Sequence, residues 1–187
     1  MNDNEKENDQ EVTADTGSEN QSINEIKTST DKTFRVIEDK TSASLSNLTI
    51  EPRGFPNTQE VFKIEDSDPL SGMFALDLNK DGFDELYLIT TAAGSGSYSG
   101  IMGFASNSDQ SVTPIYVPEM TENDLAAGGD YFGYMGHDSI YVANEQLYRK
   151  FPVYKEGDEN CCPTGGNKTL GYSLKAGEAS WILETVK

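Results

Sequence analysis

Residues 75–106 read ALDLNKDGFDELYLITTAAGSGSYSGIMGFAS. An acidic turn at 77–82 leads into an apolar run, and that run ends in a loop of glycine, serine and one tyrosine at 93–100. A second apolar run starts at Ile101. Two apolar runs joined by turn residues are typical of neighbouring antiparallel strands. The loop between them offers little side-chain volume for a core, so we expect it at the surface.

The same β pattern continues along most of the chain. Runs rich in β-branched and aromatic residues recur roughly every ten residues, with turn signals such as Asp81-Gly82 between them. No window of about a dozen residues keeps helical spacing. We therefore predict an all-β fold, an antiparallel β-sandwich with a barrel as the alternative. The expected strands lie at 33–37, 48–50, 60–64, 73–78, 85–90, 101–105, 112–117, 139–143, 146–154, 169–174 and 180–186.

The first 31 residues have a different composition. They hold nine acidic residues against Lys6 and Lys27, a net charge of −7 out of −18 for the chain. Their large apolar residues are Met1, Val12, Ile23 and Ile26. Such a segment buries too little surface to offset its chain entropy. We predict a disordered acidic tether over 1–31 and a single β-sandwich domain over 32–187.

Charge and polarity limit the partners and the location. A net charge of −18 argues against nucleic acid and anionic lipid as ligands, and it is compatible with a cationic protein partner. No stretch approaches the roughly 20 apolar residues of a membrane span. The chain is polar from Met1 onward, which we interpret as a mature exported sequence whose signal was removed. A polar tether of this kind suits a lipoprotein, with a lipid anchor on the full-length precursor.

The acidic turn has two interpretations. Asp77, Asn79 and Asp81 fall at alternate positions, followed by Glu85, and oxygen ligands in such a loop can bind calcium. The EF-hand pattern requires a glutamate where this chain has Leu88. The alternative is a hairpin whose Asp and Asn side chains bond their own backbone. Both interpretations stay open, and we assign no metal ligand and no cofactor.

An enzymatic reading of the glycine-rich loop has little support. The loop lacks the Gly-Lys-Ser/Thr ending of a phosphate-binding loop. A nucleophilic serine needs a histidine base, and Ser97, His137 and Asp138 provide the residue types of a catalytic triad. Adjacent residues such as His137 and Asp138 would point in different directions, however. We predict that the protein is not an enzyme and name no catalytic residue.

The two cysteines, Cys161 and Cys162, are neighbours in the sequence. Adjacent cysteines rarely pair, because the small ring strains the peptide bond between them. Two cysteines alone do not make a zinc site. We expect two free thiols in a loop, with an intermolecular disulfide as the alternative in an oxidising compartment.

Several short motifs in a shared order resemble the periplasmic lysozyme inhibitors that act on invertebrate-type (i-type) lysozymes. The resemblance covers roughly 70–187 and rests on DLNKDG at 77–82, AGSGSY at 93–98, GYMGHD at 133–138, FPVY at 151–154, PTGG at 163–166 and GEASW at 177–181. It implies a bacterial periplasmic or outer-envelope defence protein with a β-sandwich fold that blocks a host or competitor lysozyme. It also allows a homodimer. The cysteine pair and the long acidic tether depart from the family pattern.

The resemblance implies that the loop Ser95, Gly96, Ser97 and Tyr98 enters the active-site cleft of the enzyme. The chemistry is suitable, because hydroxyl groups can both donate to a carboxylate and accept from a protonated acid, and lysozyme clefts carry one of each. Tyrosine also dominates interface energetics. We name Tyr134 and His137 as candidate second contacts and expect Phe132 in a core. The alternative function is a calcium-stabilised β-domain that binds carbohydrate or another cell-surface ligand.

Overall fold

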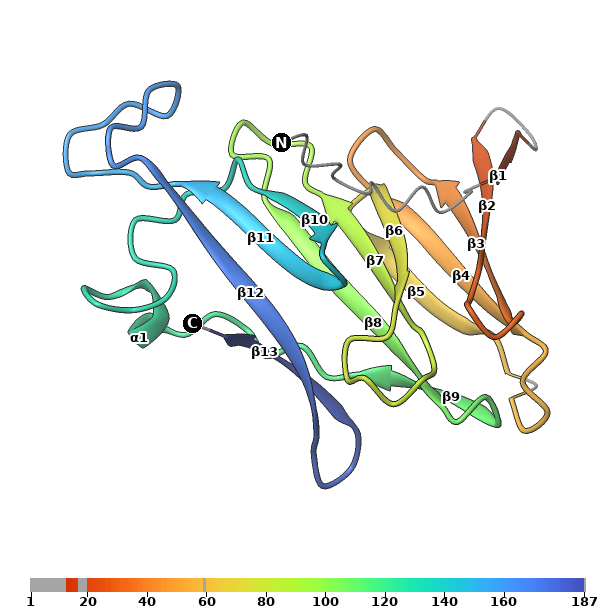
Figure 1. The fold of residues 1–187 in the computed structure, drawn as a ribbon. Coiled ribbons are helices and arrows are strands. Elements are labelled where there is room, and N and C mark those ends of the chain that lie inside the picture. Colours follow the sequence, from red (N-terminus) through yellow and green to blue (C-terminus); the bar gives the residue numbers. More distant parts are fainter. Residues whose placement is uncertain (1–12, 17–19, 59, 187) are drawn as a thin grey trace, which may run out of the picture.

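The chain folds into three antiparallel sheets that follow one another in sequence (Figure 1). The computed structural model describes residues 13–16, 20–58 and 60–186. Strands account for 53% of it and helix for 2%, so the predicted all-β class is confirmed. The first sheet contains β1 (Thr13–Thr16), β2 (Gln21–Lys27), β3 (Thr33–Lys40), β4 (Ser46–Arg53) and β5 (Phe62–Ser67), in that order.

The other two sheets have four strands each. The central sheet contains β6 (Leu70–Leu76), β7 (Glu85–Thr91), β8 (Ser99–Asn107) and β9 (Ser111–Ile115). The third sheet contains β10 (Ser139–Ala143), β11 (Gln146–Pro152), β12 (Asn167–Ala176) and β13 (Trp181–Val186). All strand pairs within the sheets are antiparallel neighbours in sequence, as hairpin connections produce.

The central sheet is covered on both faces, which makes the sandwich three layers thick. Along β7, every residue from 85 to 90 is buried. Strands buried on both faces read as continuous apolar runs, and Leu-Tyr-Leu-Ile at 86–89 is such a run. Alternate side chains of β7 point to opposite neighbours: Leu86 and Leu88 pack toward the first sheet, Tyr87 and Ile89 toward the third.

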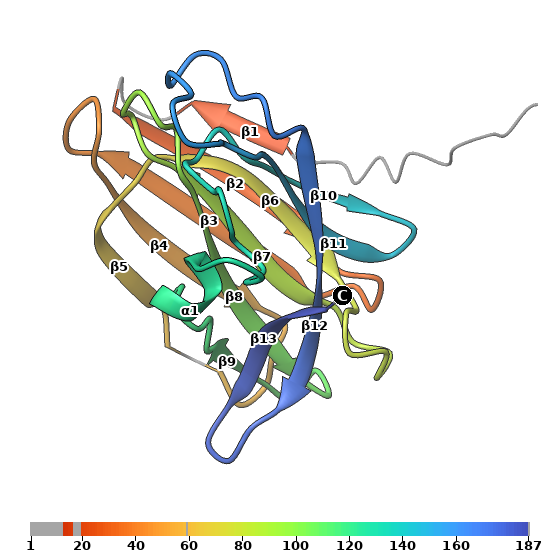
Figure 2. The ribbon, with the colours of Figure 1, turned by 90° about the vertical axis from the view of Figure 1, so that its left-hand side faces the viewer.

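Two hydrophobic cores hold the layers together. The core between the first and central sheets includes Phe34, Ile50 and Phe104, and the core between the central and third sheets includes Ile101, Leu147 and Leu183. A smaller cluster, Tyr131, Phe151 and Leu170, lies under the connection from β9 to β10. Figure 2 shows the layers from the side, with the short helix α1 (Glu122–Leu125) in that connection. Within the described ranges no helix has the length or apolarity to cross a bilayer.

The predicted tether boundary at residue 31 is wrong. β2 pairs with β3 along its whole length, and Ile26 is 1% exposed in the first core. The acidic residues of this segment fit on a strand because only Ile26 is required to face inward, while Glu25 joins Arg35 and Arg53 in ion pairs on the outer surface. Residues 1–12 and 17–19, to which the disorder prediction also applies, lie outside the described part of the chain.

Candidate functional site

The glycine- and serine-rich loop joins β7 to β8 at one end of the central sheet (Figure 1). The hairpin closes with a hydrogen bond from the Ala92 amide to the Tyr98 carbonyl, 2.9 Å. Its tip is a turn in which the Ser97 amide donates to the Gly94 carbonyl at 3.0 Å, with Ser97 at a positive φ of 42°. The loop therefore has a defined backbone path.

Two predicted contact residues are exposed at the tip. Ser95 is exposed, and Tyr98 is 47% exposed, which is a large fraction for an aromatic side chain. The Tyr98 ring folds back over Gly96: a Cβ added to Gly96 would lie 2.5 Å from the ring. Glycine at 96 is thus a requirement of the Tyr98 position. Ser97 is half-buried, and its hydroxyl donates to the Gly94 carbonyl at 3.3 Å.

A second segment, residues 133–138, lies directly against the loop. The His137 amide donates to the Gly96 carbonyl at 2.6 Å. Gly136 has a φ of +84°, and a Cβ there would lie 2.0 Å from that same carbonyl oxygen. The Tyr134 ring meets the Tyr98 ring edge-on, with centroids 5.6 Å apart. The structure therefore places Tyr134 and His137, two of the predicted contact residues, next to the loop.

A buried ion pair fixes the C-terminal stem of the loop. Asp138 Oδ2 lies 3.4 Å from Arg149 Nε, and these side chains are 0% and 5% exposed. Asp138 Oδ1 accepts from the Ser99 amide at 3.0 Å, and Arg149 Nη2 donates to the Ser99 carbonyl at 3.0 Å. Both backbone groups of Ser99 are thereby held by one charge pair. The Arg149 guanidinium also lies over the rings of Tyr131 and Tyr134.

The β11–β12 loop supplies a third support. Asn160 Nδ2 donates to the Ser95 carbonyl at 3.2 Å, and Asn160 Oδ1 lies 3.3 Å from His137 Nε2. The Tyr154 hydroxyl in turn donates to the Asn160 carbonyl at 2.7 Å. Three segments that are distant in sequence therefore meet at this end of the molecule, and Figures 1 and 2 both show their loops at the same end.

Two aromatic residues of the 131–138 segment differ in burial. Tyr134 is half-buried between Tyr98 and the Tyr131 and Phe151 rings, and burial raises its pKa well above the ordinary value. Its phenol is therefore neutral at physiological pH, able to donate and accept. The expectation that Phe132 lies in a core is wrong, because its side chain is 50% exposed. Met135 of the same segment is also exposed, at 44%.

The members of the conceivable triad have other partners. The Asp138 carboxylate is bonded to the Ser99 amide and pairs with Arg149, and the His137 ring pairs with Asn160. Cys161 and Cys162, expected as free thiols, form a disulfide with each other. They lie in an exposed turn in which the Cys162 amide bonds the Glu159 carbonyl at 2.9 Å, and this turn accommodates the small ring.

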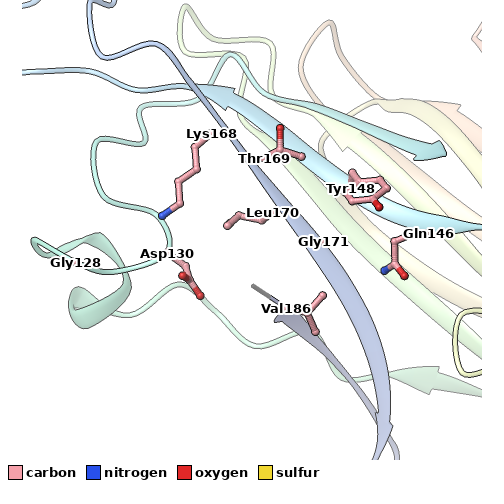
Figure 3. A pocket seen from close by; sticks show the side chains of 9 residues that line it. All are labelled: Gly128, Asp130, Gln146, Tyr148, Lys168, Thr169, Leu170, Gly171 and Val186. Atoms are coloured by element: carbon pink, nitrogen blue, oxygen red, sulfur yellow. The ribbon is translucent and has the colours of Figure 1, made fainter. Parts of the chain in front are cut away.

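A separate hollow lies on the outer face of the third sheet (Figure 3). Its lining includes Tyr148, Lys168 and Gly171, and Lys168 donates to the Gly129 carbonyl at 3.1 Å. No residue that the sequence singled out as a site residue lines it. The candidate site is therefore the exposed β7–β8 loop with its supports, and not this hollow.

Comparison of the chain with known protein families, characterised proteins and solved structures found no match.

Proposed function

We propose that this protein is an inhibitor of a lysozyme, in the manner of the inhibitors of i-type enzymes, and that the loop Ser95, Gly96, Ser97 and Tyr98 enters the enzyme's cleft. The observation that carries the proposal is an exposed Ser95 and Tyr98 on a loop whose backbone carbonyls accept hydrogen bonds from two other segments, at His137 and at Asn160. A binding element that is already ordered loses little conformational entropy on association. A loop with such backbone supports suits a concave partner for this reason.

The chemistry of the loop matches an acidic cleft. A retaining glycosidase holds two carboxyl groups about 5 Å apart, one of which is protonated. Ser95 and Tyr98 present two hydroxyl groups, each able to donate to the carboxylate or accept from the acid. A lysine or arginine at the tip would pair with the carboxylate alone, whereas hydroxyls serve both partners. Tyr98 adds aromatic area at low entropic cost.

Charge and location fit the same proposal. The net charge of −18 would steer a cationic enzyme toward the inhibitor from a distance, and this attraction weakens as salt is added. We place the protein in the bacterial periplasm or outer envelope, where it would meet lysozyme that attacks the cell wall. Tyr134 and His137, which flank the loop, are the proposed second contacts.

The test is inhibition of cell-wall lysis by i-type, c-type and g-type lysozymes, with the wild type and two variants. We expect Tyr98→Ala to lose about 2 kcal/mol or more of binding, roughly 30-fold or more in the inhibition constant. Tyr116→Ala is the matched control, because Tyr116 is a more exposed tyrosine, at 59%, at the edge of the third sheet beside β13. Equal inhibition by Tyr98→Ala and the wild type would show that the loop does not enter the cleft.

A further inference from the structure

The loop that joins β6 to β7 gathers three carboxylates at the opposite end of the central sheet from Tyr98 (Figure 1). Asp77, Asp81 and Glu85 each present one carboxylate oxygen, and these oxygens lie within 4.8 Å of one another. Like charges at this separation repel, so the arrangement needs a compensating positive charge. The nearby cation Lys80 is directed elsewhere, with its Nζ 3.0 Å from Glu145.

Hydrogen bonds inside the loop explain part of this arrangement. Asp77 accepts from the amides of Asp81 and Gly82 at 3.0 and 2.9 Å, and Asp81 accepts from the amide of Phe83 at 3.0 Å. These bonds set the turn, as the backbone-bonded hairpin interpretation requires. They involve Asp77 and Asp81 at the exposed side of the loop, and they do not account for Glu85.

Glu85 carries the argument for a ligand. It is 0% exposed, and its Oε2 accepts from the Leu78 amide at 2.9 Å and from the Tyr87 hydroxyl at 3.4 Å. Its second oxygen, Oε1, is buried without a hydrogen-bond partner among the described residues. A buried carboxylate oxygen without a partner is strongly unfavourable, and one oxygen of this same carboxylate lies in the group formed with Asp77 and Asp81.

We propose that Asp77, Asp81 and Glu85 bind a divalent cation of the calcium type. A hard cation would satisfy the orphan oxygen of Glu85 and neutralise the repulsion among the three carboxylates at once. Calcium suits this loop better than magnesium, because calcium accepts irregular sets of six to eight oxygens whereas magnesium demands near-octahedral geometry. The partly exposed Asp77 and exposed Asp81 leave an open side on which water completes the coordination shell.

The competing explanation for Glu85 is a proton. A protonated carboxyl group would also neutralise one of the three charges, and it would leave the loop without affinity for cations. The two explanations predict different effects of Glu85→Gln, because glutamine keeps the shape of the glutamate side chain and removes its negative charge. Under the proton explanation Glu85→Gln folds normally and no variant responds to calcium.

The experiment measures calcium binding by isothermal titration and thermal unfolding of the chelator-treated full chain. With calcium about 100-fold above its dissociation constant, we expect the wild-type Tm to rise by roughly 5 to 10 °C. Glu85→Gln and Asp77→Asn should lose most of this rise. Glu145→Gln is the matched control, because it removes one nearby charge outside the cluster and should keep the rise.

Terbium gives a second readout on the wild type, should a variant fail to fold. Tyr87, whose hydroxyl contacts Glu85, can transfer excitation to terbium bound at this site. Calcium should displace the terbium ion and thereby lower the terbium emission. An unchanged Tm with calcium and no binding heat would overturn the proposal. Equal loss of the Tm rise in Glu145→Gln and Glu85→Gln would also overturn it, because the effect would then be general charge screening. Neither result depends on lysozyme inhibition, which involves the other end of β7.

Discussion

The buried Glu85 carboxyl predicts that the ion-free protein loses stability as the pH rises through neutrality. In the unfolded chain this group has its ordinary pKa of 4.5, whereas burial first, then Asp81 and Asp77, raise the pKa in the folded state to about 8. Between these two values the folded state binds more protons than the unfolded state. The free energy of unfolding must therefore fall with increasing pH across that window, by linkage.

The magnitude follows from the same two values. Within this window the free energy of unfolding falls by about 1.4 kcal/mol for each pH unit, so from pH 4.5 to about 8 it falls by roughly 4 to 5 kcal/mol. That is a large part of the 5 to 15 kcal/mol of a typical domain. Glu85 is 0% exposed, so solvent screening does not reduce the effect as it would at the surface.

The assay is urea unfolding of the wild type and Glu85→Gln in the presence of chelator, from about pH 5 to about pH 9. Subtracting the two curves removes the contributions of all other titrating groups, and we expect the difference to change by several kcal/mol in favour of the variant as the pH rises. Calcium should suppress the change in the wild type, because the ion stabilises the charged carboxylate. A difference that stays constant with pH would refute the reasoning.

Four further substitutions test the site and the fold. Ser95→Ala should weaken inhibition by about 1 to 3 kcal/mol in binding free energy, measured as a shift of the inhibition constant, if it leaves a carboxylate of the enzyme unpaired. Arg149→Met should destabilise the protein by roughly 3 to 5 kcal/mol in urea unfolding, since Asp138 would be left buried without its partner; a change below about 1 kcal/mol would contradict the buried pair. Ile26→Ala should lower stability by about 2 to 5 kcal/mol, and the half-buried Ile23→Ala by clearly less; equal effects would place β2 outside the core.

Much of the fold follows from patterns that the sequence displays. Short apolar runs with turn residues between them predicted most strands, because period-two alternation and Gly or Asp turns act locally. Pro114 lies on β9, an edge strand, as expected for a residue without an amide hydrogen. β2 escaped prediction because one buried isoleucine in an acidic segment leaves no visible alternation. The strand conformation of β2 depends on pairing with β3, and amino-acid composition does not reveal which strands pair.

Short motifs in the sequence pointed to the loop at 95–98 and to Tyr134 and His137, which the structure places side by side, and that these residues bind a partner stays a prediction. The contacts that support the loop were not predicted. The Asp138–Arg149 pair left one signal: Arg149 falls on the same strand face as Leu147 and Phe151, and a charge on an apolar face requires a buried partner. Nothing in the sequence indicated that Asn160 reaches the loop, because that contact depends on how the β11–β12 loop folds.

The stem of the β7–β8 hairpin is held in place by residues outside the loop. Thr91 pairs with Ser99 at the mouth of the loop, and Ser99 is clamped on both its amide and its carbonyl by Asp138 and Arg149. The hairpin stem is therefore fixed by groups outside residues 93–98, whereas within that six-residue segment Gly96 meets His137 and Gly136. If the proposed loop insertion is right, exchanging the segment with Gly96 kept should change which grooves the protein fits and leave the stem in place.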